Sequence, residues 1–321
     1  MSATLPPSSA TTFVPLRRRE AARPSVSLRI DGMPVEVPAG TTILGACQSL
    51  GVEVPTLCWL ETLTPVNACR LCVVEVEGAR VLAPACSRAV EPDMKVSTQS
   101  PRVRHSRKLV LELLASSVDL STTPGMDALL AEYGCDPERY GPPAPPDAHR
   151  DRAVAGHHAP PDPRFRATVA QPVKLDNDLY VRDYGKCVLC YKCVEACGED
   201  HQNTFAIAIA GRGFDARVST ELATPLPDSA CVYCGNCIAV CPTGALMART
   251  EWEMRASGTW NAATQSATDT ICPYCGVGCT LTLHVQDGAI VKATSPLENA
   301  ITLGNLCIKG RFGWRFVNAR G

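Results

Sequence analysis

Two quartets of cysteines lie close together in the sequence, and their spacing is that of a metal-cluster site. The first is Cys187, Cys190, Cys193 and Cys197, and the second is Cys231, Cys234, Cys237 and Cys241. Each reads C-x2-C-x2-C-x3-C, and Pro242 follows the second. A cubane iron–sulfur cluster takes three thiolates from one tight loop, whose backbone N–H groups also point at the anionic cluster. The spacing therefore favours two [4Fe-4S] clusters over zinc, whose ligands come in two pairs, and over disulfides.

The two quartets resemble the run of bacterial two-cluster ferredoxins. In that family the first three thiolates of a quartet hold one cubane, and the fourth crosses to the other. The resemblance implies that one [4Fe-4S] cluster is bound by Cys187, Cys190, Cys193 and Cys241. It implies that the second is bound by Cys231, Cys234, Cys237 and Cys197.

The composition sets the class of protein. The chain has 321 residues, of which 45% are hydrophobic, so two or three folded domains are expected. It has eighteen cysteines, and the first 25 residues lack the apolar run of an export signal, which predicts reduced, metal-bound thiols and a cytoplasmic location. No apolar stretch is long enough to span a membrane. The net charge of −1 gives no sign of nucleic-acid binding, so proteins or redox cofactors are the expected partners.

The N-terminal part predicts a tail followed by a small β domain. Residues 1–24 are rich in Ser, Thr, Pro and Ala and are expected to form a disordered tail, with an organelle transit peptide as the alternative. The alternating segments VSLRI and MPVEVP flank Asp31-Gly32 and predict a β-hairpin. A short helix capped by Thr41 or Thr42 should follow, with Cys47 on its apolar face as a core residue.

A third set of cysteines follows this helix, with gaps of ten, two and thirteen residues. Its members are Cys58, Cys69, Cys72 and Cys86. The strand-like segments VVEVE and ARVLAP lie between the last two. A hairpin, a helix and a cysteine loop together suggest the β-grasp fold of plant-type [2Fe-2S] ferredoxins. The first gap is longer than the plant-type C-x4-C, which indicates a variant branch.

That branch is identifiable from residues 26–100. They resemble the [2Fe-2S] domain of the large iron–sulfur subunit of respiratory complex I, of NAD-linked hydrogenase diaphorase subunits and of the formate dehydrogenase α subunit. The next domain of these proteins normally supplies H-x3-C-x2-C-x5-C for a His-ligated [4Fe-4S] cluster. Here the four ligand positions are occupied by Ser117, Ser121, Pro124 and Leu130. We therefore expect residues 102–135 to form a helical domain without a cluster, with His105 at the surface and Cys135 unligated.

The rest of the chain divides by composition. Residues 25–101 should form the [2Fe-2S] domain, 136–172 a proline-rich linker in which His157 and His158 are exposed, and 173–250 the two-cluster domain. Residues 251–268 should connect it to the last domain. The overall fold class predicted is α+β.

The last cysteine set should build a fourth cluster in residues 269–321. Its members are Cys272, Cys275, Cys279 and Cys307, with Gly276 and Gly278 allowing close backbone approach. A hairpin with its turn at Asp287-Gly288 lies between the last two. This segment resembles the N-terminal [4Fe-4S] domain of molybdopterin-dependent oxidoreductases, and closely that of NAD-linked formate dehydrogenases, down to LCIKGRFGWRFV. The resemblance implies that Lys309 lies between the cubane and the pterin.

We expect the last domain to be truncated, with no catalytic residues in the chain. The apolar side chains of the segment RFGWRFV should then be exposed unless a partner covers them or the segment folds back on its own domain. They are Phe312, Trp314, Phe316 and Val317.

The leading interpretation is the iron–sulfur portion of an NAD-linked formate dehydrogenase α subunit. It would hold one [2Fe-2S] and three [4Fe-4S] clusters and carry electrons between a molybdenum or tungsten bis-pterin on a catalytic partner and FMN and NAD on a diaphorase partner. The assignment of formate as the substrate rests on the resemblance of the C-terminal quartet alone. The alternatives are a diaphorase subunit of an NAD-linked hydrogenase, which would lack the fourth quartet and Lys309, and a non-catalytic iron–sulfur assembly protein.

Overall fold

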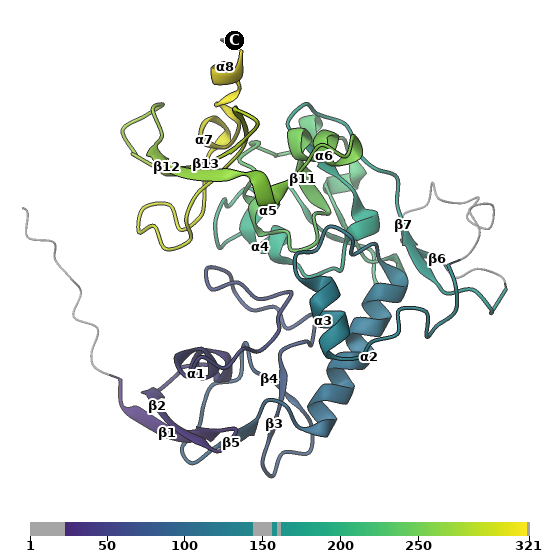
Figure 1. The fold of residues 1–321 in the computed structure, drawn as a ribbon, viewed down its shortest axis with the longest axis vertical. Coiled ribbons are helices and arrows are strands. Elements are labelled where there is room, and N and C mark those ends of the chain that lie inside the picture. Colours follow the sequence, from purple (N-terminus) through teal and green to yellow (C-terminus); the bar gives the residue numbers. More distant parts are fainter. Residues whose placement is uncertain (1–22, 144–155, 159–161, 320–321) are drawn as a thin grey trace, which may run out of the picture.

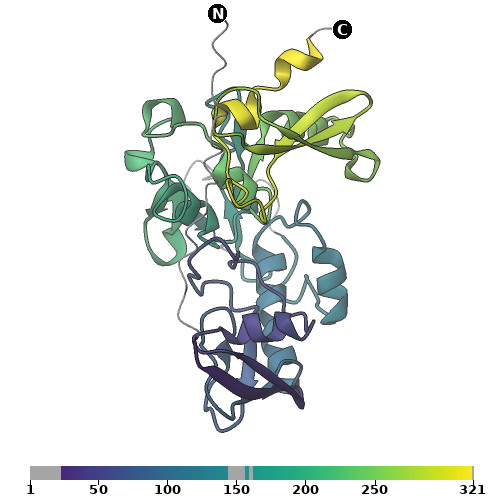
Figure 2. The same ribbon diagram turned by 90° about the vertical axis from the view of Figure 1, so that its left-hand side faces the viewer.

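Three units follow one another along the chain in the computed structural model (Figure 1), which describes residues 23–143, 156–158 and 162–319. The N-terminal and C-terminal units lie at opposite ends of the molecule, and the unit with the central cysteines lies between them (Figure 2). The tail predicted for residues 1–24 falls, up to residue 22, outside the described residues. Among the described helices, none is both long enough and apolar enough to cross a membrane.

The N-terminal unit begins with the predicted hairpin and helix. Asp31 and Gly32 form the turn with positive φ values of 48° and 83°, which suits glycine at the second position. The Thr42 hydroxyl caps the helix by accepting the Gly45 N–H at 3.1 Å. Cys47 is wholly buried, as expected of a core residue. The elements are β1 (Ser25–Ile30), β2 (Met33–Pro38), α1 (Ile43–Ser49), β3 (Val73–Val76), β4 (Ala83–Pro84) and β5 (Lys95–Ser97).

These strands form one sheet in the order β2-β1-β5-β3-β4. Strands β1 and β5 are parallel, and the other neighbours are antiparallel. Alternate residues of β1, namely Val26, Leu28 and Ile30, are buried against α1. Cys72 and Cys86 lie in the same core. The sheet is the β-grasp arrangement that the sequence predicts, and it anchors the last two cysteines of the N-terminal set.

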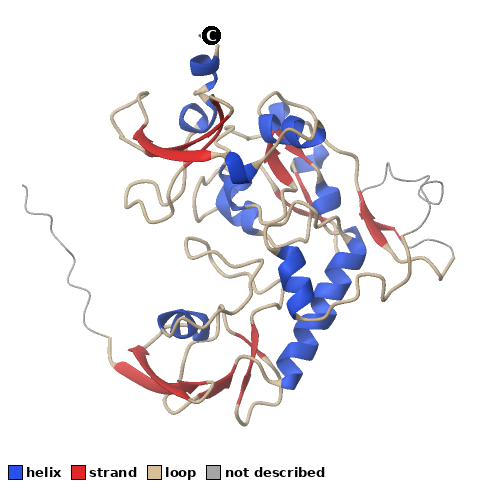
Figure 3. Ribbon diagram, viewed as in Figure 1, coloured by secondary structure: helices blue, strands red, loops and turns tan. Residues whose placement is uncertain are grey.

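Two helices, α2 (Pro101–Ser117) and α3 (Met126–Glu132), lie side by side next to this sheet (Figure 3). The buried Arg107 guanidinium donates to the Tyr133 hydroxyl and to the Val73 carbonyl, both at 2.8 Å. The buried Glu112 carboxylate pairs with Arg139 at 3.0 Å. The two hydrogen bonds of Arg107 hold α2 against both β3 and the end of α3.

The central unit is built around two short helices, α4 and α5, which pack against each other. Strands β8 and β11 pair antiparallel beside them, as do β9 and β10. In the segment predicted as a linker, β6 and β7 also pair. The bounds are β6 (Gly156–His158), β7 (Thr168–Ala170), β8 (Tyr180–Arg182), α4 (Lys192–Cys197), β9 (Ala208–Ala210), β10 (Arg217–Ser219), α5 (Asn236–Val240), β11 (Leu246–Ala248) and α6 (Arg249–Ala256). Short 3-10 turns are η2 (Tyr184–Lys186), η3 (Gly213–Asp215), η4 (Glu221–Ala223), η5 (Leu226–Asp228) and, just before the last unit, η6 (Ala262–Thr264).

The C-terminal unit is a three-stranded antiparallel sheet with two short helices packed on its last strand. The predicted hairpin turn at Asp287 and Gly288 is present, with φ values of 53° and 77°. The bounds are β12 (Ser266–Ile271), β13 (Thr280–Gln286), β14 (Ala289–Thr294), α7 (Ile308–Phe312) and α8 (Arg315–Asn318).

The closing segment follows the fold-back alternative for two of its four apolar residues and is exposed at the other two. Phe312 stacks on Tyr180 of the central unit, with ring centroids 6.2 Å apart, and is buried. Trp314 is buried against Ile290 and Ala293 of its own unit. Phe316 and Val317 are about half exposed. The segment folds back and joins two units, because its aromatic side chains find apolar partners on both.

Candidate metal centres

The N-terminal cysteines lie close together in two segments that flank β3 and β4: Cys58, Cys69 and Cys72 precede β3, and Cys86 follows β4. The Cys69 N–H points at the sulfur of Cys58 at 3.4 Å. The Asn67 side-chain oxygen accepts from the Ser87 hydroxyl at 2.7 Å and from the Cys86 thiol at 3.3 Å, which holds the two segments together. Asn67 has a positive φ of 58°, a backbone form that asparagine tolerates better than most residues.

In each of two hydrogen-bonded cysteine pairs, one thiol is favoured as thiolate, which is the form that binds iron. A hydrogen bond from the Cys58 thiol is the main cause that lowers the pKa of Cys69 to about 5. A hydrogen bond from Cys86 likewise lowers the pKa of Cys72 to about 7, and the donors Cys58 and Cys86 have raised pKa values. The four thiols are therefore near enough to share protons, and their chemistry fits a cluster with four sulfur ligands.

The two central loops have the same local geometry. In each, the N–H two residues after the first cysteine points at its sulfur at 3.4 Å: Leu189 at Cys187, and Tyr233 at Cys231. Positive φ values occur at the second and fourth positions after that cysteine in both loops. These residues are Leu189, Tyr191, Tyr233 and Gly235, with φ of 51°, 67°, 56° and 72°. Such turns direct successive N–H groups toward one point, as an anionic cluster requires.

The central cysteines line two separate cavities, and the fourth cysteine of each quartet lies in the cavity of the other. One cavity is lined by Cys187, Cys190, Cys193 and Cys241. The other is lined by Cys197, Cys231, Cys234 and Cys237. Helices α4 and α5 lead from one cavity to the other. Cys197 is the last residue of α4, and Cys241 follows α5 directly. The structure thus brings together the two crossed sets of thiols that the sequence predicts as ligand sets.

Burial raises the pKa of every central cysteine for which a shift is resolved. For Cys193 the Cys241 thiol adds to burial, and for Cys237 the Cys234 and Cys197 thiols do so. The Tyr180 hydroxyl lies 3.0 Å from the Cys231 sulfur, and burial, then Cys237 and Cys231, raise its pKa. Sequence patterns do not reveal Tyr180 as a site residue, because nothing around it separates it from an ordinary strand residue.

The C-terminal cysteines gather in a more open site. Cys272 is buried and its N–H donates to the Cys279 carbonyl at 2.8 Å, whereas Cys275 and Cys307 are exposed. Burial, then the thiols of the other three cysteines, raises the pKa of Cys279. Gly278 has a positive φ of 69°, whereas Gly276 does not. Lys309 lies on α7 with an exposed side chain.

The four positions predicted to have lost their ligands belong to the helical region. Ser117 ends α2, Leu130 lies in α3, and Ser121 and Pro124 lie in the turn between them. His105 is exposed. The Cys135 sulfur lies 3.8 Å from the Lys108 carbonyl. Within the described ranges, no three side chains of His, Cys, Asp or Glu converge as they would on a single ion. The thiolates of an iron–sulfur cluster are distributed over two or four iron atoms and need not converge on one ion.

The [2Fe-2S]-type loop docks directly on the helices of the central unit, a contact that local sequence patterns cannot reveal. Leu63, between Cys58 and Cys69, is buried against Ala196 of α4 and Val240 of α5. The Thr64 N–H donates to the Asp200 carboxylate at 2.7 Å. The first two units therefore meet at the cysteine loops themselves.

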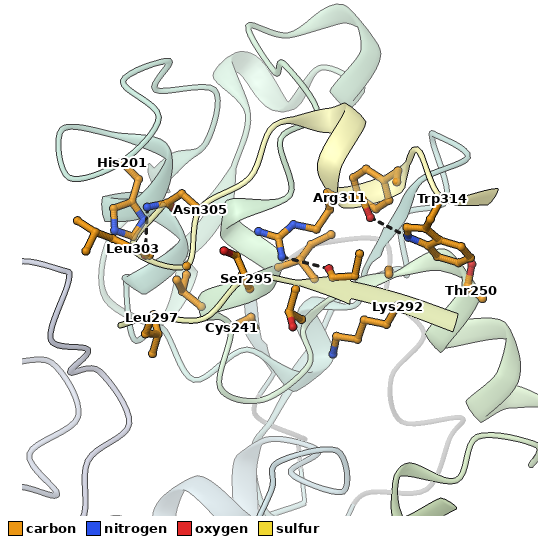
Figure 4. A pocket seen from close by; sticks show the side chains of 18 of the residues that line it. His201, Cys241, Thr250, Lys292, Ser295, Leu297, Leu303, Asn305, Arg311 and Trp314 are labelled. Carbon is orange, nitrogen blue, oxygen red and sulfur yellow. Dashed lines mark hydrogen bonds between the residues drawn. The ribbon is translucent and has the colours of Figure 1, made fainter. Parts of the chain in front are cut away.

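A second junction joins the central unit to the C-terminal unit. The Asn236 side-chain oxygen accepts the Leu306 N–H at 3.0 Å and a guanidinium N–H of Arg311 at 3.2 Å. Beside this junction a cavity of about 230 Å³ is lined by residues of both units, among them Cys241 and Arg311 (Figure 4). Burial lowers the pKa of Arg311 to about 10, against the opposing effect of the Cys234 and Cys237 thiols, so the side chain is charged at neutral pH.

Three sequence models of protein families match the chain, one in each unit. Residues 23–101 match the 2Fe-2S iron–sulfur cluster binding domain. Residues 186–245 match the 4Fe-4S dicluster domain. Residues 265–319 match the molybdopterin oxidoreductase Fe4S4 domain.

Curated relatives match nearly the whole chain. A subunit of the NADH-quinone oxidoreductase of Rhizobium meliloti is 32% identical, and the NADPH-Fe(3+) oxidoreductase subunit alpha of Geobacter sulfurreducens is 34% identical; each match covers 92% of this chain and 32% of the relative. A putative formate dehydrogenase of Staphylococcus haemolyticus is 26% identical over 90% of this chain and 31% of its own length. The chain thus spans about a third of the length of these relatives.

A solved structure shares the fold. An NAD+-reducing [NiFe]-hydrogenase in the H2-reduced state aligns with a TM-score of 0.56 and 23% identity, covering 70% of this chain and 87% of that chain. The predicted α+β fold with its ferredoxin-type domains is therefore confirmed. The chain thus contains segments that match 2Fe-2S and 4Fe-4S iron–sulfur domains, and it is related to subunits of NADH- and NADPH-linked oxidoreductases.

Proposed function

We propose that this chain is the iron–sulfur part of an NAD-linked formate dehydrogenase α subunit and relays electrons through one [2Fe-2S] and three [4Fe-4S] clusters. When bound, the clusters would supply one-electron carriers held by the cysteine thiolates. The observation that carries the proposal is the pair of central cavities lined by the crossed thiol sets. The proposed ligand domains are residues 25–101, 173–250 and 269–321, with 102–135 as a helical domain that holds no cluster, followed by the linker 136–172 and the connector 251–268.

The contacts between units support an order for the relay. The loop with Cys58 and Cys69 docks on α4 and α5 through Leu63. Burial raises the pKa of Cys190 to about 11, and the Cys69 thiol of the N-terminal loop adds to this effect. At the other junction, α7 begins directly after Cys307 and contacts the loop that contains Cys234 through Arg311. These contacts support a relay that runs from the N-terminal set through the two central sets to the C-terminal set.

The C-terminal site has the surface that a docking partner would need. Cys275 and Cys307 are exposed. Around them, the side chains of Ile271 and Val277 are both 60% exposed, and Ile308 is 41% exposed. Exposed apolar side chains gathered around a redox site mark an interface. In this proposal a subunit or domain with a molybdenum or tungsten pterin covers them, and Lys309 lies on the electron path between that pterin and the cluster.

The C-terminal unit supports formate rather than hydrogen as the substrate of the proposed complex. The match of residues 265–319 is to a molybdopterin oxidoreductase domain, and a relative of 26% identity is described as a putative formate dehydrogenase. At the opposite end of the relay, a flavin subunit that reacts with NAD would dock near the [2Fe-2S] unit, since the relatives are subunits of NADH- and NADPH-linked oxidoreductases.

Co-expression tests this function. The chain, produced with a pterin-binding subunit from the same operon, should form a stable complex in which formate reduces the iron–sulfur clusters, as followed by electron paramagnetic resonance (EPR). The Cys307→Ser variant should bind the partner but lose most of this reduction, because the cluster nearest the pterin would be damaged. The proposal fails if formate reduces no cluster in the complex while hydrogen does so with a NiFe partner.

A further inference from the structure

Arg311 extends from the C-terminal unit into the central unit. It belongs to α7 and is 5% exposed. Its guanidinium lies 3.5 Å from the Cys234 carbonyl and 3.2 Å from the Asn236 side-chain oxygen, and a third N–H group lies 3.5 Å from the Ala293 carbonyl of β14. Figure 4 shows the Arg311 side chain among the residues that line the junction cavity. The cation is therefore placed beside one of the two central cysteine loops.

This buried cation has no carboxylate partner among the residues that the structure describes. The hydrogen-bond partners of its guanidinium are two carbonyls and one amide oxygen, all neutral. A buried, unpaired charge costs several kcal/mol, so a nearby negative charge is expected to offset it. The cysteine set of the adjacent cavity, which includes Cys234 and Cys237, would bring that negative charge once its thiolates bind a cluster.

Gly235 explains why the arginine reaches this loop. A Cβ atom at Gly235 would lie 3.0 Å from the Cγ of Arg311 and 3.2 Å from the Phe312 ring, so a side chain here would displace both. The corresponding position in the other central loop is Tyr191, which also has a positive φ but carries a large side chain. The two loops thus repeat the same backbone and differ, at this position, in the room that they leave for Arg311.

We propose that Arg311 is a positioning residue that raises the reduction potential of the cluster bound by Cys197, Cys231, Cys234 and Cys237. This inference rests on the proposed iron–sulfur relay. A cluster with four thiolates is anionic, and its one-electron reduction, with the electron coming from a neighbouring cluster, adds a negative charge. A fixed cation beside it stabilises the reduced form more than the oxidised form, and the low dielectric constant of a buried site increases the effect.

The test is an EPR-monitored redox titration of the anaerobically purified full chain and its variants. Arg311→Gln and Arg311→Met remove the charge, Arg311→Lys keeps it, and Arg315→Gln removes an exposed arginine of the same segment as a matched control. In the neutral variants the midpoint potential of one [4Fe-4S] signal should become more negative. The expected change in the reduction equilibrium is on the order of tenfold, about 59 mV for a one-electron couple. Arg311→Lys should retain most of the original potential, and Arg315→Gln all of it.

Each other outcome has a defined meaning. Unchanged potentials in both neutral variants, at full iron content, would overturn the inference and leave the relay intact. Loss of this cluster in both neutral variants would also overturn it, because Arg311 would then hold the loop together and set no potential. A parent chain that contains no [4Fe-4S] signals would refute the proposed relay itself, which separates the two failures.

Discussion

Replacing Cys197 by serine should destroy the cluster bound mainly by Cys231, Cys234 and Cys237 and leave the cluster of its own quartet intact. The reason is that Cys197 lines the cavity of the second quartet, at the end of α4. Serine offers a hard oxygen where iron–sulfur clusters select thiolate. The variant should lose about four iron atoms or show a three-iron cluster at one site only, which Mössbauer and EPR spectra distinguish.

The matched control is Cys135→Ser. Cys135 is half-buried, and the partner of its sulfur is the Lys108 carbonyl rather than another thiol. This variant should keep every cluster signal. If Cys197→Ser instead removed only the cluster of Cys187, Cys190 and Cys193, ligation would be local to each quartet and the crossed assignment would be wrong.

Replacing Leu63 by aspartate should uncouple the N-terminal unit from the central unit. Leu63 is 6% exposed and packs on Ala196 and Val240, so the change puts a charge into an apolar contact. Truncating a buried leucine costs about 2–5 kcal/mol, and the carboxylate adds a desolvation penalty. The magnetic interaction between the reduced [2Fe-2S] cluster and its [4Fe-4S] neighbour should weaken strongly in relaxation-based EPR, and electron transfer between them should slow.

Leu222→Asp is the control for this variant, because Leu222 is 92% exposed in the insert between the two quartets. It should leave both the magnetic interaction and the transfer rate unchanged. An undiminished interaction in Leu63→Asp, with both clusters present, would show that the electron path does not cross this contact.

Much of the architecture could be predicted from local patterns. The hairpins at Asp31-Gly32 and Asp287-Gly288 and the helix capped at Thr42 all follow from short-range turn and capping chemistry, and all are present. The cysteine groups could be predicted for the same reason, since three members of each central set are close in sequence. Such signals need no knowledge of tertiary contacts.

The contacts between units could not be predicted in this way. In the sequence, Leu63 is a single apolar residue in a loop. It is buried only because it packs on helices that lie more than 130 residues further along the chain. Local patterns predict an exposed closing segment because its partners, Tyr180 for Phe312 and Ile290 for Trp314, are distant in sequence. Arg311 shows no local sign of its role, since only the fold places it against Gly235. These features arise from tertiary packing, which overrides local preference.

Iron and acid-labile sulfide analysis of the anaerobically purified chain, combined with EPR, tests the central claim most directly. The four cysteine sets predict one [2Fe-2S] and three [4Fe-4S] clusters, or about 14 iron atoms per chain. No His-ligated fifth cluster should appear, because Ser117, Ser121, Pro124 and Leu130 offer no thiolate or imidazole. Zinc in place of iron at either central quartet would contradict the electron-relay account, and a fifth cluster would contradict the assignment of the helical domain.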